Sequence, residues 1–221
     1  MGIGRLASAL LVTGLMIASA SAQSPDCLVI EDFKAAPVGQ LPSQWKLRKD
    51  GGKGVYAVQE EGGLRFLRAM SRGIGIQAAR AFEWDLAEYP ILAWSWRPQQ
   101  FPQGADERRA ETNDSALSVY VVVQYSKVRG PKAVKYIWSE RVPVGERLNS
   151  NQGLTQVRVL RAGRDGIGEW KDERVNARDD YRAFFNESQT PHAAGIAVLT
   201  DSDDTQSTAA GDYANFRACR G

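Results

Sequence analysis

The chain has 221 residues, with 28 basic side chains, 26 acidic side chains and a single histidine. Residues 1–22 read as a removable signal peptide, which leaves 199 residues for one domain, residues 23–221, with 27 basic and 26 acidic side chains. This near balance of charge excludes a general attraction to nucleic acid or to an anionic membrane. One histidine and two cysteines also leave few side chains for a catalytic triad or a zinc centre.

The N-terminus predicts export. Arg5 precedes an apolar stretch at residues 6–18, and Ala20-Ser21-Ala22 has the small-x-small pattern that signal peptidase cleaves. The apolar stretch is shorter than the roughly 20 residues that a spanning helix needs. We therefore expect cleavage before Gln23, a periplasmic or secreted protein, and no membrane insertion after cleavage.

The two cysteines, Cys27 and Cys219, lie at opposite ends of the mature chain. In an oxidising compartment an even pair usually closes into a disulfide, and the alternative is two separate thiols. If the bond forms, the first and last segments are neighbours in space, most simply as two adjacent strands.

Short apolar or alternating runs, separated by glycine-rich turns, recur along the chain and predict an all-β sandwich. Val119, Val121 and Val123 fall on one side of an extended segment, while Tyr120 and Gln124 fall on the other. The ten predicted strands are 27–33, 55–60, 64–69, 74–82, 91–97, 116–125, 133–139, 155–161, 194–199 and 213–218.

Two segments depart from this pattern. Tyr181, Phe184 and Phe185 share one face of a helix predicted at about 177–186, which we expect to close one end of the sandwich. The polar stretch Gln99–Asn113 reads as a long solvated loop, and loops of that length in a domain are often functional.

The side chains available for catalysis are carboxylates, since His192 reads as a histidine at the start of a strand. Paired carboxylates hydrolyse glycosidic bonds when they are about 5 to 9.5 Å apart. If the protein is an enzyme, the candidate acids are Glu140, which follows Trp138 closely, and Asp114. The alternative is that strand glutamates of this kind form surface ion pairs.

An acidic turn at residues 200–205 contains Asp201 and Asp203. Alternating acids in a turn supply the oxygen ligands that calcium prefers, although Gln206 stands where a calcium loop has glycine. The alternative is a solvated turn in which the aspartates cap backbone amides. No other cofactor is expected, and a calcium ion here would be structural.

Aromatic residues at a spacing of two indicate either a sandwich core or a sheet surface that stacks against sugar rings. Trp94 and Trp96 form one such pair, and the second pair is Tyr136 and Trp138. The candidates for ligand contact are Trp96, Asp114, Tyr120, Gln124, Tyr136 and Trp138.

Several stretches, taken in order, resemble the bacterial family described as domain of unknown function 3047. They are 92–97, 113–114, 119–123, 136–138, 169–170, 179–182 and 195–205. The resemblance implies an exported, single-domain bacterial protein with no assigned activity. Ser118 and Lys135 depart from the family pattern, which commonly has arginine and asparagine at these positions.

A looser likeness links the chain to carbohydrate-binding jelly-roll modules of the galactose-binding type. The opening Ile30-Glu31-Asp32-Phe33, Trp45 and the closing segment 212–216 look like parts of the first and last strands of that fold. This likeness implies a jelly roll and a structural calcium ion shared by acids near those strands, here Asp32 and Asp212.

These observations favour a periplasmic or secreted jelly-roll β-sandwich that binds a glycan or another polar ligand of the cell envelope without catalysis. The first alternative is a glycoside hydrolase or lyase on the same fold. The second is a structural or assembly partner in the envelope, which would expose an apolar patch.

Overall fold

The computed structural model of the chain describes residues 26–221. The predicted signal peptide at residues 1–22 therefore lies outside the described residues. None of the helices between residues 26 and 221 is long and apolar enough to cross a membrane.

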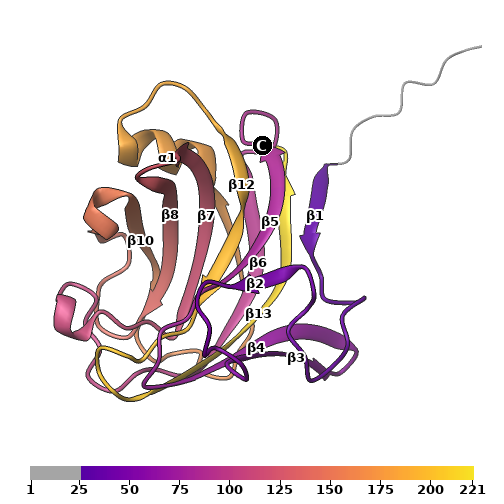
Figure 1. The fold of residues 1–221 in the computed structure, drawn as a ribbon, viewed down its shortest axis with the longest axis vertical. Helices are drawn as coiled ribbons and strands as arrows, with labels where there is room; N and C mark the ends of the chain where they lie inside the picture. Colours follow the sequence, from indigo (N-terminus) through magenta and orange to yellow (C-terminus); the bar gives the residue numbers. More distant parts are fainter. Residues whose placement is uncertain (1–25) are drawn as a thin grey trace, which may run out of the picture.

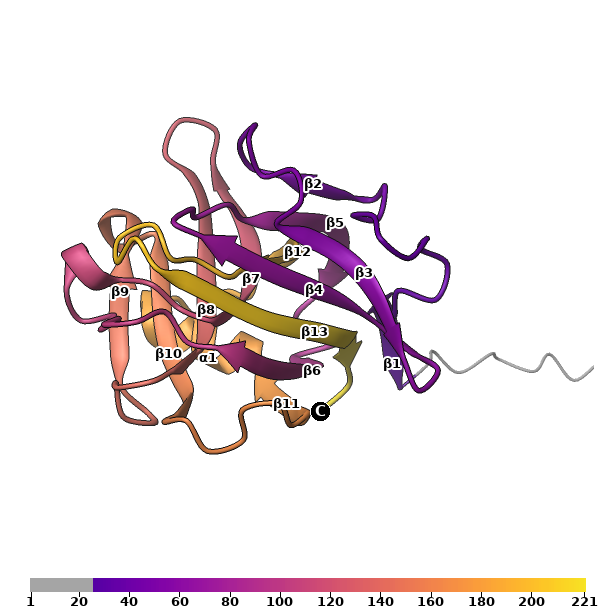
Figure 2. The same ribbon diagram turned by 90° about the horizontal axis from the view of Figure 1, so that it is seen from below.

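Two β-sheets face one another across a shared core, as Figures 1 and 2 show from perpendicular directions. One sheet has six strands, in the order β11-β6-β13-β4-β3 with β1 also paired to β13, and the other has seven, in the order β2-β5-β12-β7-β8-β10-β9. The predicted all-β, jelly-roll fold class is confirmed. The strands are β1 Cys27–Glu31, β2 Trp45–Leu47, β3 Tyr56–Glu61, β4 Leu64–Arg72, β5 Ala78–Asp85, β6 Ile91–Gln100, β7 Leu117–Ser126, β8 Gly130–Ser139, β9 Arg147–Ser150, β10 Thr155–Ala162, β11 Lys171–Asn176, β12 His192–Leu199 and β13 Thr208–Cys219, with helix α1 at Ala177–Phe185 and 3-10 turns at Ala110–Thr112 and Asn151–Gly153.

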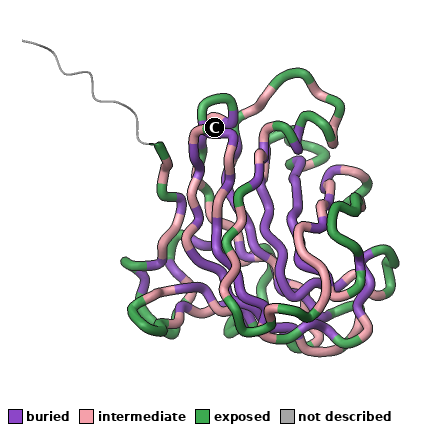
Figure 3. The backbone as a smooth tube through the Cα atoms, turned by 180° about the vertical axis from the view of Figure 1, so that it is seen from behind, coloured by how far each residue is buried: buried purple, intermediate pink, exposed green. Residues whose placement is uncertain are grey.

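Side chains alternate between the two faces of a β-strand, and this alternation decides which of them enter the core. Val119, Val121 and Tyr136 point between the sheets, whereas Tyr120 on β7 and its register partner Lys135 on β8 lie on the outer face of the seven-stranded sheet. Figure 3 shows the result, with buried residues along the strands and exposed residues mostly in the connections. The seven-stranded sheet therefore has a core face and an outer face that is itself partly buried.

The last strand, β13, organises the six-stranded sheet. It pairs along one side with β6, and along the other side first with β4 and then with β1. Cys27 and Cys219 are register partners on β1 and β13 and form a disulfide. The predicted bond and the predicted pairing of the first and last strands are both confirmed.

Helix α1 lies where the sequence predicts it, one residue shorter at its C-terminal end. The Asn176 side chain accepts a hydrogen bond from the Asp179 backbone N–H and caps the helix. Tyr181 enters the core, and Asp180 accepts hydrogen bonds from the Tyr136 hydroxyl at 3.0 Å and from Arg158 at 2.8 Å. The helix is thus anchored to the seven-stranded sheet at one end of the sandwich.

Removing the disulfide should lower the free energy of unfolding. The bond joins residues 192 positions apart, and the loop-entropy model gives a stabilisation of about 5 kcal/mol for a loop of that length. We expect the Cys27→Ala/Cys219→Ala variant to unfold at a lower urea concentration than the oxidised wild type. Reduced wild-type protein serves as the control and should match the variant, and equal stability of oxidised and reduced wild type would contradict the prediction.

Candidate functional site

A hollow of about 650 Å³ lies on the outer face of the seven-stranded sheet. Its floor is made of small and aliphatic side chains on β5, β12, β7 and β8, together with the ring of Tyr120. Residues after β2 border it on one side, and the β7–β8 hairpin and the β9–β10 connection border it on another. Ligand pockets in proteins commonly span about 300 to 1,000 Å³, so the hollow has the size of a binding site.

Small side chains keep the floor low. Ala79 on β5 and Ala133 on β8 line the hollow, and the buried Ala197 on β12, the register partner of Ala79, packs against the same apolar group. Val122 and Leu199 complete the apolar surface. Larger side chains at the alanine positions would fill the hollow, so the residue choice on this outer face creates the space.

Lys135 and Tyr120 form a buried polar pair beside this floor. The Lys135 Nζ lies 5.6 Å from the centroid of the Tyr120 ring. Burial opposes the charged form of Lys135, but Tyr120, Asp201 and Glu107 outweigh it and raise the pKa of its ammonium. Burial also raises the pKa of the Tyr120 hydroxyl, against the lowering effects of Lys135 and Arg48. The pair is therefore a phenol beside an ammonium at neutral pH.

The connection between β6 and β7 brings a carboxylate to this pair. The expectation of a fully solvated loop at Gln99–Asn113 is wrong, because β6 extends to Gln100 and both Asp106 and Glu107 are buried. Glu107 accepts hydrogen bonds from the hydroxyls of Ser139 at 2.6 Å and Ser115 at 3.2 Å. Burial raises its pKa. The loop folds onto the sheet, where Ser139 at the end of β8 holds the Glu107 carboxyl group, while Asp106 pairs with Arg108 inside the loop.

Three carboxylates meet at the end of β12. Asp114, Asp201 and Asp203 each offer an oxygen, and these oxygens lie within 4.8 Å of one another. Asp114 is fully buried and accepts hydrogen bonds from the Thr205 backbone N–H at 2.7 Å and hydroxyl at 2.6 Å. Asp203 is exposed and lies against Gly75, which borders the hollow. Hard oxygen donors of this kind suit calcium or magnesium.

Asp201 links this cluster to the polar pair. It accepts a hydrogen bond from the Ser115 backbone N–H at 2.7 Å, and its residue pairs with Gly75. Burial raises the pKa of Asp201 to about 7, although Lys135 lowers it in part. Its neighbours Asp114 and Asp203 add to the rise. The cluster therefore brings two buried carboxyl groups and one exposed carboxyl group together next to the hollow.

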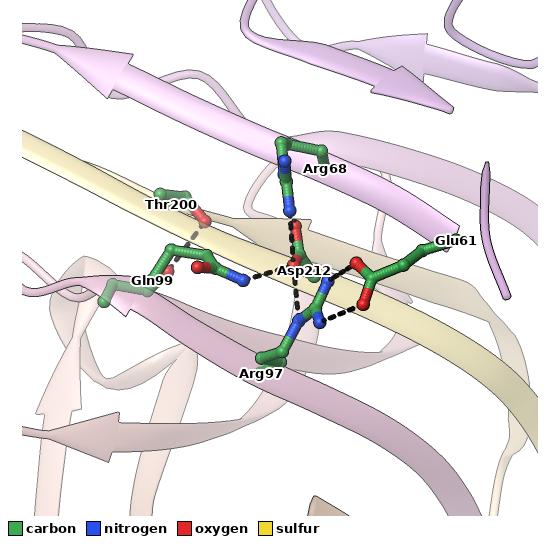
Figure 4. Close-up of polar contacts among 7 residues, drawn as sticks. Glu61, Arg68, Arg97, Gln99, Thr200 and Asp212 are labelled. Atoms are coloured by element: carbon green, nitrogen blue, oxygen red, sulfur yellow. Dashed lines mark hydrogen bonds and ion pairs between the residues drawn. The ribbon is translucent and has the colours of Figure 1, made fainter. Parts of the chain in front are cut away.

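The outer face of the six-stranded sheet carries a different polar cluster, shown in Figure 4. Asp212 on β13 is fully buried and accepts hydrogen bonds from Arg68 at 2.8 and 3.0 Å, Arg97 at 2.8 Å and Gln99 at 2.7 Å. Arg97 also pairs with Glu61 at 3.0 Å, and these contacts lower the pKa of that glutamate. Every charge drawn in this cluster has an opposite charge in contact.

The surroundings of Asp212 argue against the predicted calcium pair of Asp32 and Asp212. The Asp212 carboxylate accepts hydrogen bonds from two guanidinium groups and one amide, and the two guanidinium charges would repel a cation. Asp32 lies in the turn after β1 and pairs with Lys34 at 3.4 Å. The two other predicted ligands, Asp201 and Asp203, do come together, and Asp114 joins them.

Three aromatic ligand candidates are core residues, so Trp96 and Tyr136 are not accessible for the predicted ligand contact, and Trp138 presents only an edge. Trp96 and Tyr136 are fully buried between the sheets, and Trp138 is 2% exposed. Their polar atoms bond to the protein, with the Trp96 indole donating to Glu173 at 2.9 Å. An edge of Trp138 borders a second hollow of about 490 Å³ near β10 and β11.

The remaining candidates separate in space. Tyr120 lines the hollow, while Gln124 is exposed on β7 and lies outside the lining. Glu140 pairs with Arg164 at 2.9 Å, whereas Asp114 bonds to Thr205. The two candidate catalytic acids thus engage separate partners.

Sequence reasoning assigned none of the cations to the site, although it singled out Lys135 as a departure from the family pattern. Arg48, Lys49 and Arg129 line the hollow, and Lys135 lies next to Tyr120. The alternation along β8 places Lys135 on the same face as Tyr120, so the lysine could have been found from the strand pattern. The other three lie in connections that only the folded chain brings together.

The fold and the hollow define a jelly-roll β-sandwich with a ligand-sized site on one sheet. The family model for the protein of unknown function DUF3047 matches residues 43–217, and the chain belongs to this family. Ser118 and Lys135 lie on the same outer face of neighbouring strands. Comparison with curated proteins finds no match.

Among solved structures, the chain is similar to a family 61 carbohydrate-binding module in complex with β-1,4-galactotriose, with 12% identity over 90% of this chain and 100% of that one and a TM-score of 0.43. It is similar to a family 28 module specific for non-crystalline cellulose, with 11% identity over 88% and 94% of the two chains and a TM-score of 0.46. A family 30 module of a cellulosomal cellulase from Clostridium thermocellum has 12% identity over 86% and 96% and a TM-score of 0.46. These likenesses concern the fold alone.

Protonation of Glu107 should stabilise the folded protein. Its pKa in the folded chain is raised above the ordinary 4.5, so the folded state binds this proton more tightly than the unfolded state. The stabilisation is present at low pH and is lost as the pH rises through the raised pKa. We expect the free energy of unfolding of the wild type, relative to Glu107→Gln, to fall from pH 4.5 towards neutral pH.

Urea unfolding at a series of pH values measures this difference. Glu83→Gln, at an exposed glutamate on β5, is the control and should follow the wild type. Parallel profiles for the wild type and Glu107→Gln would contradict the burial of a titrating carboxyl at this position.

Proposed function

We propose that the hollow on the seven-stranded sheet binds a glycan or another polar ligand without catalysing a reaction. The observation that carries this proposal is a ligand-sized hollow whose apolar floor is surrounded by hydrogen-bonding groups. Specific pockets commonly combine an apolar surface with a few placed polar groups. The surface of the hollow has this composition.

The polar groups suit a ligand with many hydroxyls. Gln77 and Asn151 carry amides that donate and accept, while Ser150 and Thr155 carry hydroxyls that do the same. The apolar floor at Ala79 and its neighbours can contact the C–H faces of sugar rings. A saccharide presents both kinds of surface together, which a purely apolar molecule does not.

The two candidate catalytic acids are already bonded to other residues of the protein, which fits a binding role. Asp114 holds Thr205, and Glu140 holds Arg164, so neither carboxylate projects freely towards the hollow. Neither residue lines the hollow. This arrangement favours binding over a paired-carboxylate hydrolysis that would use these two residues.

Export of the protein to the periplasm or beyond is part of the proposal. The signal-like residues 1–22 motivate it, and the Cys27–Cys219 disulfide supports it, since such bonds persist in oxidising compartments. A glycan of the cell envelope or its surroundings would meet the protein there.

Filling the hollow should abolish binding. Ala79→Trp places an indole on the floor, next to β12, at a residue that is partly exposed and outside the core cluster. For any polysaccharide that retains the wild type on a glycan array or in affinity electrophoresis, we expect the affinity of this variant to fall by roughly tenfold or more, which is about 1.4 kcal/mol.

Met70→Trp is the matched control, because Met70 is exposed on β4 of the opposite sheet. It should bind as the wild type does. Unchanged binding by a folded Ala79→Trp variant would place the ligand elsewhere, and failure of the wild type to bind any polysaccharide would refute the proposed function.

We also propose that a calcium ion is held by Asp114, Asp201 and Asp203. The close approach of three hard-oxygen groups and the raised pKa of the desolvated Asp201 support it. Calcium should raise the melting temperature of the wild type but not that of Asp203→Asn, whose side chain is exposed. Asp165→Asn, at another exposed aspartate, should respond as the wild type, and no response of the wild type would refute the proposal.

A further inference from the structure

The charged residues that line the hollow all have one sign. Arg48, Lys49 and Arg129 contribute to its surface, and no aspartate or glutamate of the described chain does so. Arg48 and Lys49 follow β2, whereas Arg129 belongs to the β7–β8 hairpin. Two separate segments therefore supply positive charge to one site, although basic and acidic side chains nearly balance over the whole chain.

These three cations are not neutralised within residues 26–221. None of them takes part in an ion pair there, and all three are exposed. Arg129 lies over the ring of Tyr125, 5.9 Å from its centroid, an arrangement that leaves its charge in place. Elsewhere on the sandwich, Arg68 and Arg97 are held by carboxylates.

The acids near the hollow do not cancel this charge. Asp201 and Glu107 act on Lys135, which is buried beside Tyr120. Asp203 touches Gly75 at the border but forms no ion pair with a lining cation in the described chain. The free donors of the hollow are thus guanidinium and ammonium groups together with hydroxyls and amides.

We propose that the ligand is an acidic oligosaccharide, whose carboxylate or sulfate groups pair with Arg48, Lys49 and Arg129. This inference rests on the proposed function and names its ligand class. Guanidinium groups bind carboxylates and sulfates through charge-assisted, often bidentate hydrogen bonds. The neutral amides and hydroxyls of the hollow then serve the sugar hydroxyls.

The fold explains why the charge is available to a ligand. A cation on the rim keeps its water until a ligand anion replaces it, so leaving it unpaired carries little penalty in the free protein. A buried cation such as Lys135 needs protein partners instead. Lys135 is therefore buried and neutralised by the protein, whereas the three cations that line the hollow are exposed and available to a ligand.

The test compares acidic oligosaccharides with their neutral counterparts. Affinity electrophoresis and calorimetry would use polygalacturonate, alginate and chondroitin sulfate, each beside its carboxyl-reduced or desulfated form. We expect the wild type to bind at least one acidic member about tenfold more tightly than its neutral form, and added salt to weaken this preference.

The variant Arg48→Gln/Lys49→Gln/Arg129→Gln should lose the preference while keeping any weak binding to the neutral form. Its matched control is Arg141→Gln/Arg174→Gln/Arg182→Gln, which removes the same charge from three exposed arginines outside the hollow. The control should retain the preference, and both variants should unfold at the wild-type temperature because all six side chains are exposed.

Equal binding of acidic and neutral forms, or an unchanged preference in the hollow variant, would overturn the acidic ligand and leave the proposed glycan site standing. Tighter binding of a single-stranded oligonucleotide than of every acidic saccharide would also overturn it, by assigning the charge to a different polyanion. Absence of binding to every polysaccharide, charged or neutral, would overturn both proposals.

Discussion

The burial of one ammonium group on the outer face of the seven-stranded sheet constrains the whole site. A buried charge is costly unless opposite charges and hydrogen-bond acceptors surround it. Tyr120 on the neighbouring strand lies beside Lys135, and the charges of Asp201, in the turn after β12, and Glu107, in the connection between β6 and β7, favour its charged form. Groups from three segments that are distant in the sequence thus compensate one ammonium, and Tyr120 among them lines the hollow.

The two outer faces of the sandwich differ in whether their charged side chains have partners of opposite charge. On the six-stranded sheet, Asp212 is enclosed by two arginines and a glutamine, so that cluster is complete without a ligand. On the outer face of the seven-stranded sheet, Lys135 is compensated by neighbouring groups of the protein, whereas the three cations that line the hollow form no ion pair within residues 26–221. This asymmetry favours the seven-stranded sheet as the binding surface, since its charges still lack partners.

The predictions from sequence succeeded where local chemistry decides the outcome. Aromatic spacing located α1, and short apolar or alternating runs located ten strands. The strands that escaped prediction, β2, β9 and β11, all lie at sheet edges. An edge strand pairs on one side and buries little, so it does not need the apolar alternation that reveals a central strand. The burial of Trp96, Tyr136 and Trp138 was undecided because a spacing of two fits both a core and a surface.

The sequence by itself determined the β-sandwich, the two possible disulfide partners and the small number of side chains suited to catalysis, because these follow from residue type, spacing and number. Only the tertiary structure decided which face is hollow and which charges remain free. Arg48 and Arg129 are far apart in the chain and meet at one hollow. Asp212 and Asp201 are both aspartates near the C-terminus, yet one is neutralised by arginines and the other lies among carboxylates. Such pairings depend on strand order and register, which local residue patterns do not encode.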